Sequence, residues 1–98
     1  MARFIVRIEL IQGLPNANSN YDKLNEEMVN AGFSQIVPAT TGNHHQLPTG
    51  NYYIIGDFNI EKITNDVKLT ASKVSTGFTT LISEVIDMRF NGLDLSKN

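Results

Sequence analysis

Two adjacent histidines, His44 and His45, are the residues whose types best suit chemistry in this chain. They lie in the stretch TTGNHHQLPTGNYY, residues 40–53. Histidine changes charge near neutral pH, so a loop pair could transfer protons, contact phosphate, bind a metal or lie inert in solvent. Neighbouring residues rarely share a metal that needs three or four ligands, so we expect no metal site. A solvated loop and a role in RNA cleavage both stay open.

A second group of candidate functional residues consists of carboxylates and arginines in the first and last predicted strands. Glu9 lies near the end of the first predicted strand, and Asp87 and Arg89 lie near the end of the last. Such carboxylates could hold magnesium, although solvated surface charges are commoner. Arg7 and Glu9 share the same strand parity, so we expect them to form a pair on one face. The sequence has no phosphate-binding glycine loop, nucleophile elbow or zinc-protease motif, and it leaves the enzyme class uncertain, with magnesium as the one possible cofactor.

Composition narrows the class of protein. A chain of 98 residues is sufficient for one domain with its own core, and the absence of cysteine excludes disulfides, thiolate zinc sites and a thiol nucleophile. With 8 basic and 10 acidic residues the net charge is -2, so RNA binding would need a local patch. The first apolar run is interrupted at Arg7, which predicts a cytoplasmic protein without membrane insertion.

Hydrophobic periodicity predicts the secondary structure of the first half of the chain. Alternation over residues 3–10 indicates a strand with one buried face, carried by Phe4, Val6, Ile8 and Leu10. Residues 11–20 read as a loop in which Ser19 caps a helix that ends at Gly32. The buried face of this helix is expected to carry Tyr21, Leu24, Met28 and Ala31. A short apolar segment over 33–38 and a strand over 51–58 place the histidines in the connection of a long hairpin.

The second half continues the pattern with another helix and strand. Asn59 is predicted to cap a helix that ends near Gly77, with helical spacing at Ile60, Ile63, Val67, Ala71 and Val74. Residues 79–90 are rich in β-branched side chains, which predicts a last strand. The order βαββαβ is typical of an α+β, ferredoxin-like domain: a four-stranded antiparallel sheet with both helices on one face. We expect one domain over 1–90, and residues 91–98 as a tail or a short fifth strand.

The sheet face without helices is expected to have a partner. It should carry Ile5, Arg7 and Glu9 together with one of two sets, Tyr52 with Ile54 or Tyr53 with Ile55. Isoleucine and tyrosine on an uncovered face indicate either a second copy of the chain or stacked RNA bases. The glycine and aromatic consensus of RNA-recognition motifs is absent from the third strand, which excludes a standard domain of that kind.

The stretch GFSQIVPATTGNHHQLPTGNYYI resembles the central part of the GhoS family of type V antitoxins. The matching positions are Phe33, Ser34, Ile36, Val37, Gly42, Gln46 and Leu47. The similarity of length and element order extends over residues 4–90. The resemblance implies a ferredoxin-like fold similar to small CRISPR-associated endonucleases. It also implies an endoribonuclease that cuts single-stranded messenger RNA of a partner membrane toxin.

The resemblance also suggests site residues, with two departures from the family pattern. Asn25 stands where the family has a helix arginine, with Lys23 as the nearest cation, and His45 stands at the family's basic position before Gln-Leu. His45, with His44 beside it, is the implied proton-transfer residue; the expected RNA contacts are Lys23, Arg7, Arg89 and Asn25. The alternative is a non-catalytic module that self-associates, as a homodimer, through its open face or last strand. The sequence identifies no other protein partner.

Overall fold

The computed structural model of the chain describes residues 2–11, 17–38 and 44–86. Within these ranges the elements are β1 Ala2–Leu10, α1 Ala17–Asn30, β2 Ile36–Pro38, β3 His44–Gln46, β4 Asn51–Gly56, α2 Ile60–Ser72 and β5 Phe78–Val85. The α+β class predicted from the sequence is confirmed. Asp87, Arg89 and the predicted tail over 91–98 lie outside the described residues.

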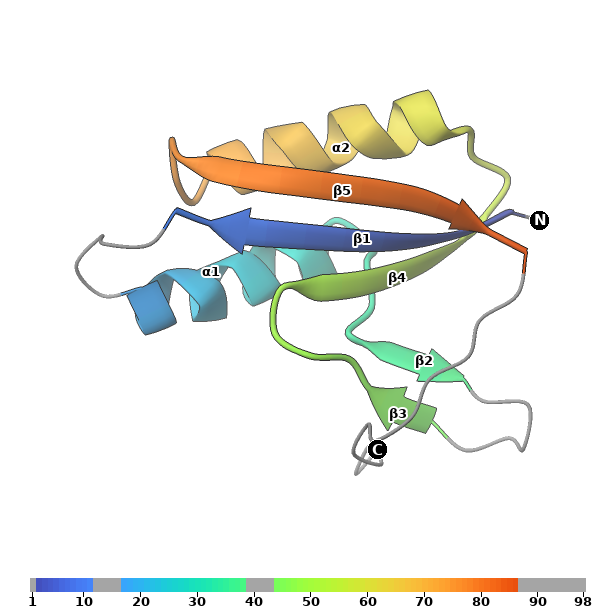
Figure 1. Cartoon of the computed structure of the whole chain (residues 1–98), viewed down its shortest axis with the longest axis horizontal. Helices are drawn as coiled ribbons and strands as arrows, with labels where there is room; N and C mark the ends of the chain where they lie inside the picture. Colours follow the sequence, from blue (N-terminus) through green and yellow to red (C-terminus); the bar gives the residue numbers. More distant parts are fainter. Residues whose placement is uncertain (1, 12–16, 39–43, 87–98) are drawn as a thin grey trace.

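The main sheet has three antiparallel strands in the order β4-β1-β5, with β1 in the centre (Figure 1). Val6 faces Tyr52 of β4 on one side and Ile82 of β5 on the other. The expected four-stranded sheet is present only in part. The chain before β2 meets β4 through one bridge, between Ser34 and Tyr53, and β2 then pairs with β3 in a separate two-stranded sheet.

The hydrophobic core lies between the sheet and the two helices, which both pack on one face (Figure 1). The alternation predicted in β1 is confirmed, because its even-numbered residues from Phe4 to Leu10 are buried in the core. The helices contribute most of their expected apolar residues, but Ala31 and Ile60 are exposed, and Val74 lies beyond the end of α2 and is only partly buried. The fully buried helix side chains are Leu24, Met28, Ile63, Val67 and Ala71.

The helix ends follow the sequence signals at two of four positions, because α2 ends at Ser72, with Lys73 as its C-cap, and not near Gly77 as predicted. Asn59 is the N-cap of α2, and its side chain accepts a hydrogen bond from the Lys62 N–H at 2.8 Å. Gly32 ends α1 with φ of 99°, while Phe33 N–H donates to the Met28 carbonyl at 2.9 Å. The capping role predicted for Ser19 is wrong, because α1 already begins at Ala17. Several neighbouring residues suit a cap, so the sequence does not single out one of them.

A tight turn before β4 fixes the register of the sheet. Gly50 has φ of 86°, and its carbonyl accepts a hydrogen bond from the Ile8 N–H at 2.7 Å. A Cβ at this position would lie 2.6 Å from the Ile8 carbonyl oxygen, so only glycine fits without a shift of the backbone. Counting from this pair, Tyr52 and Ile54 face the helices, and Tyr53 and Ile55 face the other side.

Candidate functional site

The open face is the set of β1, β4 and β5 side chains that point away from the helices. Its members are Arg3, Ile5, Arg7, Glu9, Asn51, Tyr53, Ile55, Thr79, Leu81, Ser83 and Val85. Two of them are large apolar side chains in contact with solvent, Ile55 with 47% and Leu81 with 62% of its surface exposed. Tyr53, by contrast, is only 6% exposed. The uncovered apolar character expected from the sequence is therefore present at Ile55, and Leu81 adds an exposed apolar residue that was not among those expected.

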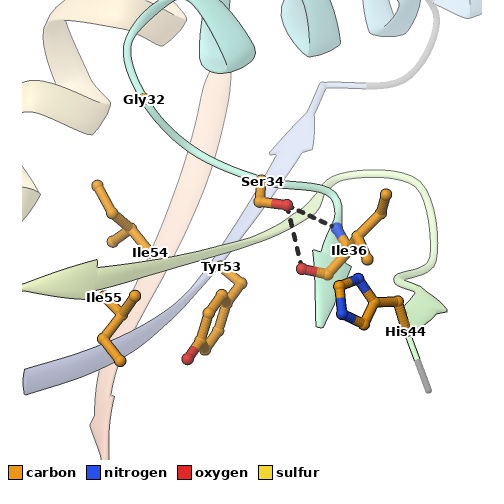
Figure 2. A pocket seen from close by; sticks show the side chains of 7 residues that line it. All are labelled: Gly32, Ser34, Ile36, His44, Tyr53, Ile54 and Ile55. Carbon is orange, nitrogen blue, oxygen red and sulfur yellow. Dashed lines mark hydrogen bonds between the residues drawn. The ribbon is translucent and has the colours of Figure 1, made fainter. Parts of the chain in front are cut away.

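A hollow of about 330 Å³ lies where the open face meets the small β2-β3 sheet. Its lining residues are Gly32, Ser34, Ile36, His44, Tyr53, Ile54 and Ile55. Figure 2 shows the side chains of Tyr53 and Ile55 on one side of β4 and that of Ile54 on the other. The His44 ring lies beside Ile36 (Figure 2). One imidazole and one phenol ring thus share an otherwise mainly apolar hollow.

Ser34 holds the two walls of this hollow together. Its backbone N–H and C=O bond to the C=O and N–H of Tyr53 at 2.8 and 2.7 Å. Its hydroxyl accepts a hydrogen bond from the Ile36 N–H at 3.0 Å and lies 3.1 Å from the Ile36 carbonyl (Figure 2). Such a local side-chain bond turns the backbone out of the ladder. The chain therefore leaves β4 after one bridge and carries β2 and β3 to the side.

The histidines lie in a strand rather than in the irregular hairpin connection that the sequence predicted. β3 pairs with β2 so that His44 faces Pro38 and His45 faces Val37. Adjacent residues of a strand point to opposite sides, so the two rings do not share one site. His44 is exposed and lines the hollow, whereas His45 is half-buried and is not among the lining residues. The geometry therefore favours His44 over His45 as the residue that meets a ligand there.

The four predicted RNA-contact residues do not gather at one place. Arg7 is on the open face, where its Nη2 lies 3.8 Å from Glu9 Oε2, and the expected same-face pair is confirmed. Lys23 is exposed on α1, on the helix side of the sheet (Figure 1). Asn25 accepts a hydrogen bond from the Tyr52 hydroxyl, and Arg89 lies outside the described residues. The described part of the hollow thus has no cation among its lining residues.

The carboxylates do not form a metal site within the described residues. No group of three or more histidine, aspartate or glutamate side chains is close enough there to hold a metal ion. Glu9 pairs with Arg7, and Asp87 is outside the described ranges. A divalent cation bound by oxygen ligands needs several of them around one point. The described geometry therefore gives no support to the magnesium role considered for Glu9.

The sequence left two residues of the hollow without an assigned role there. Tyr53 was one of two alternatives, and the choice depended on the strand register, which the Gly50–Ile8 contact sets. Ser34 was a matched position of the resemblance without an assigned role. A signal for its role was present, because a serine just before a short apolar segment often bonds to its own backbone two residues on. Only the place of Tyr53 required the strand register, because the bond of Ser34 to Ile36 is local.

No protein-family model matches the chain, and a search of curated protein sequences found no match. Within the described residues, neither helix has both the length and the apolar character needed to cross a bilayer. The features of the described chain that could bind a ligand or a partner are the hollow, the open face and the strand edges.

Proposed function

We propose that the protein binds single-stranded RNA at the hollow beside β4 and cuts it slowly, as an antitoxin directed at the messenger RNA of a membrane toxin. The observation that carries the RNA part is the hollow that Tyr53, Ile55 and His44 line together. Unpaired bases bind proteins by entering mainly apolar sites and stacking on aromatic or imidazole rings. The toxin target and the ferredoxin-like assignment rest on the GhoS resemblance, with the Ser34–Tyr53 bridge as the remnant of a fourth strand.

The cleavage step that fits these residues uses the RNA's own 2'-hydroxyl. A base removes its proton, the oxygen attacks the adjacent phosphorus, and the 5' oxygen leaves with a proton from an acid. The products are a 2',3'-cyclic phosphate and a 5'-hydroxyl end. His44 lines the hollow and can serve as base or acid, while His45 points to the other side of β3. With one imidazole at the site, we expect slow turnover.

The charge of the protein determines how the RNA would be held. The net charge is -2, and the exposed Arg7 is already paired with Glu9. An exposed pair of this kind is worth little, so Arg7 can turn to a phosphate at small cost. With few phosphate contacts, the affinity should fall only weakly with salt, because few counterions are released. Stacking should then supply most of the binding energy.

The test is a titration of fluorescently labelled single-stranded RNA, followed by anisotropy, with the matching duplex as competitor. We expect the single strand to bind in preference, and His44→Ala to weaken binding on the order of 10-fold, the loss of about one stacked base. Lys23→Ala, on the helix side, is the matched control and should leave affinity unchanged. Equal loss in both variants, or no RNA binding by the wild type, would reject the proposal.

The second candidate function is a non-catalytic interaction module. Exposure of Ile55 and Leu81 on the open face favours it, since apolar side chains on one surface mark protein contacts as well as RNA contacts. The same RNA titration, together with a measurement of self-association, distinguishes this second function from RNA binding. A wild type that associates with itself but neither binds nor cuts RNA has this function instead.

A further inference from the structure

β5 forms one edge of the main sheet. It pairs along its whole length with β1, from Arg3 opposite Val85 to Leu10 opposite Phe78. Among the described residues no strand pairs with its other side, because the sheet order is β4-β1-β5. The edge is visible along the upper side of the sheet in Figure 1. A strand of 8 residues therefore presents one row of backbone groups away from β1.

The register shows which backbone groups point outward. The Ile11 N–H donates to the Gly77 carbonyl at 3.1 Å, which extends the β1-β5 ladder by one pair. Hydrogen-bonded pairs alternate along an antiparallel ladder, so Arg7 with Leu81 is another such pair. The residues between them direct their N–H and C=O groups to the free edge. These residues are Phe78, Thr80, Ile82 and Glu84.

This edge lacks the features that normally prevent strand pairing. Natural edges carry proline, lysine, a bulge or a very short strand. The sequence of β5, FTTLISEV, has no proline or lysine, and its register with β1 runs without a bulge. Its one charged residue, Glu84, is near the end of the strand. The middle of the strand carries Leu81, with 62% of its surface exposed.

We propose that β5 pairs in antiparallel fashion with β5 of a second copy, about a two-fold axis at Leu81. Outward groups must meet outward groups, so Thr80 of one copy exchanges hydrogen bonds with Ile82 of the other. Phe78 and Glu84 then pair at each end, and no like charges lie opposite one another. The two Leu81 side chains meet in a non-hydrogen-bonded pair, the closest kind of contact, which removes both from water.

With the two-fold axis one residue further along the strand, the outward backbone groups would still form hydrogen bonds, but less exposed apolar surface would be buried. With the axis at Ile82, two side chains that already pack against the core would meet, and each Leu81 would face Ser83. The axis at Leu81 is preferred because it buries the most exposed apolar residue of the strand. The product is a continuous six-stranded sheet with all helices on one face. Edge pairing alone buries a modest area, so the dimer should be weak and concentration-dependent.

The proposal is independent of RNA binding, and sedimentation equilibrium over a concentration series tests it. The wild type should pass from monomer to dimer. Leu81→Lys places two positive charges at the axis and should raise the dissociation constant on the order of 10-fold or more. Ile55→Lys is the matched control, because Ile55 is an exposed open-face residue on β4, away from the axis. It should leave the dissociation constant unchanged.

Amide hydrogen exchange separates edge pairing from stacking of two open faces. We expect the Thr80 and Ile82 amides to gain protection as protein concentration rises, whereas the Leu81 amide, bonded to β1, is protected throughout. Three results would each overturn the proposal: a monomer at every concentration, equal weakening by Leu81→Lys and Ile55→Lys, or Thr80 and Ile82 protection that does not change with concentration.

Discussion

The hydroxyl of Tyr52 donates a hydrogen bond to Oδ1 of Asn25 at 2.5 Å, and this contact joins β4 to α1. The Tyr52 side chain is fully buried. Burial, and to a smaller extent the nearby Tyr21, raises the pKa of Tyr52 from 10.0 to about 12. The phenol therefore stays neutral and keeps its donor proton well above the pH at which an exposed tyrosine ionises.

This contact predicts a loss of stability at alkaline pH. The folded-state pKa of Tyr52 is raised, so its contribution to stability is complete below pH 10 and is lost as pH rises from 10 toward about 12. In that window the unfolded chain has released the proton and the folded chain has not. The free energy of unfolding should fall by on the order of 2 kcal/mol from this group. Urea unfolding at a series of pH values measures it.

Tyr52→Phe is the control for the alkaline experiment, since it removes this one phenol and leaves the rest of the chain unchanged. The variant leaves the Asn25 oxygen without its donor and should be about 1–2 kcal/mol less stable at pH 7. Its stability should then fall less steeply than that of the wild type between pH 10 and 12. Parallel curves for the two proteins would show that the Tyr52 phenol is not the titrating group.

A pair of substitutions in α2 tests the core. Val67 is fully buried and Leu69, two residues on, is 66% exposed. Val67→Asp buries an unpaired charge and should lower the free energy of unfolding by about 3–5 kcal/mol, measured by urea denaturation. Leu69→Asp introduces the same side chain in solvent and should change stability by about 0.5 kcal/mol or less. Similar losses in both variants would contradict the placement of α2 on the sheet.

Alanine substitutions at two glycines with positive φ distinguish the cost of backbone strain from the cost of a steric clash. Gly32 and Gly50 have φ of 99° and 86°, but a Cβ would meet nothing within 4 Å at Gly32 and the Ile8 oxygen at 2.6 Å at Gly50. Gly32→Ala should cost about 1 kcal/mol, and Gly50→Ala at least about 2 kcal/mol. Thermal or urea unfolding compares them. A smaller cost at Gly50 would mean that the close approach to Ile8 is absent in solution.

Single-turnover cleavage of RNA distinguishes the two histidines. The resemblance implies His45 as the acid–base residue, while the hollow is lined by His44. We expect His44→Ala to lower the rate by on the order of 10²-fold, and His45→Ala to have a smaller effect. His44→Arg should keep a phosphate contact but abolish proton transfer, because arginine stays charged. Full activity in both alanine variants, with folding intact, would remove the imidazoles from the mechanism.

The main elements were predictable where one local signal determined them. The alternation of apolar residues predicted β1, and Asn59 followed by apolar residues at helical spacing predicted the start of α2. Both predictions were confirmed. The start of α1 was not predictable, because several residues near Ser19 suit a cap equally. The fourth strand was overestimated, because the polar and backbone bonds of Ser34 direct the chain out of the sheet after one bridge.

The hollow could not be predicted because it depends on register and on a very short strand. β3, with the sequence HHQ, has neither alternation nor β-branched residues, and backbone bonds to β2 form it. The choice between Tyr52 and Tyr53 for the open face followed only from the Gly50 turn. The sequence identified the histidines as notable, but only the strand pairing shows which ring lines the hollow.

The central position of β1 has a consequence for synthesis on the ribosome. β1 leaves the exit tunnel before the other elements, yet it has strand partners on both sides, and one of them, β5, is the last described element to be made. Its apolar residues cannot be fully covered until β5 emerges. β1 can pair with β4 midway through translation, but its other edge must stay unpaired until β5 emerges, and such a late, non-local pairing favours slow, post-translational folding.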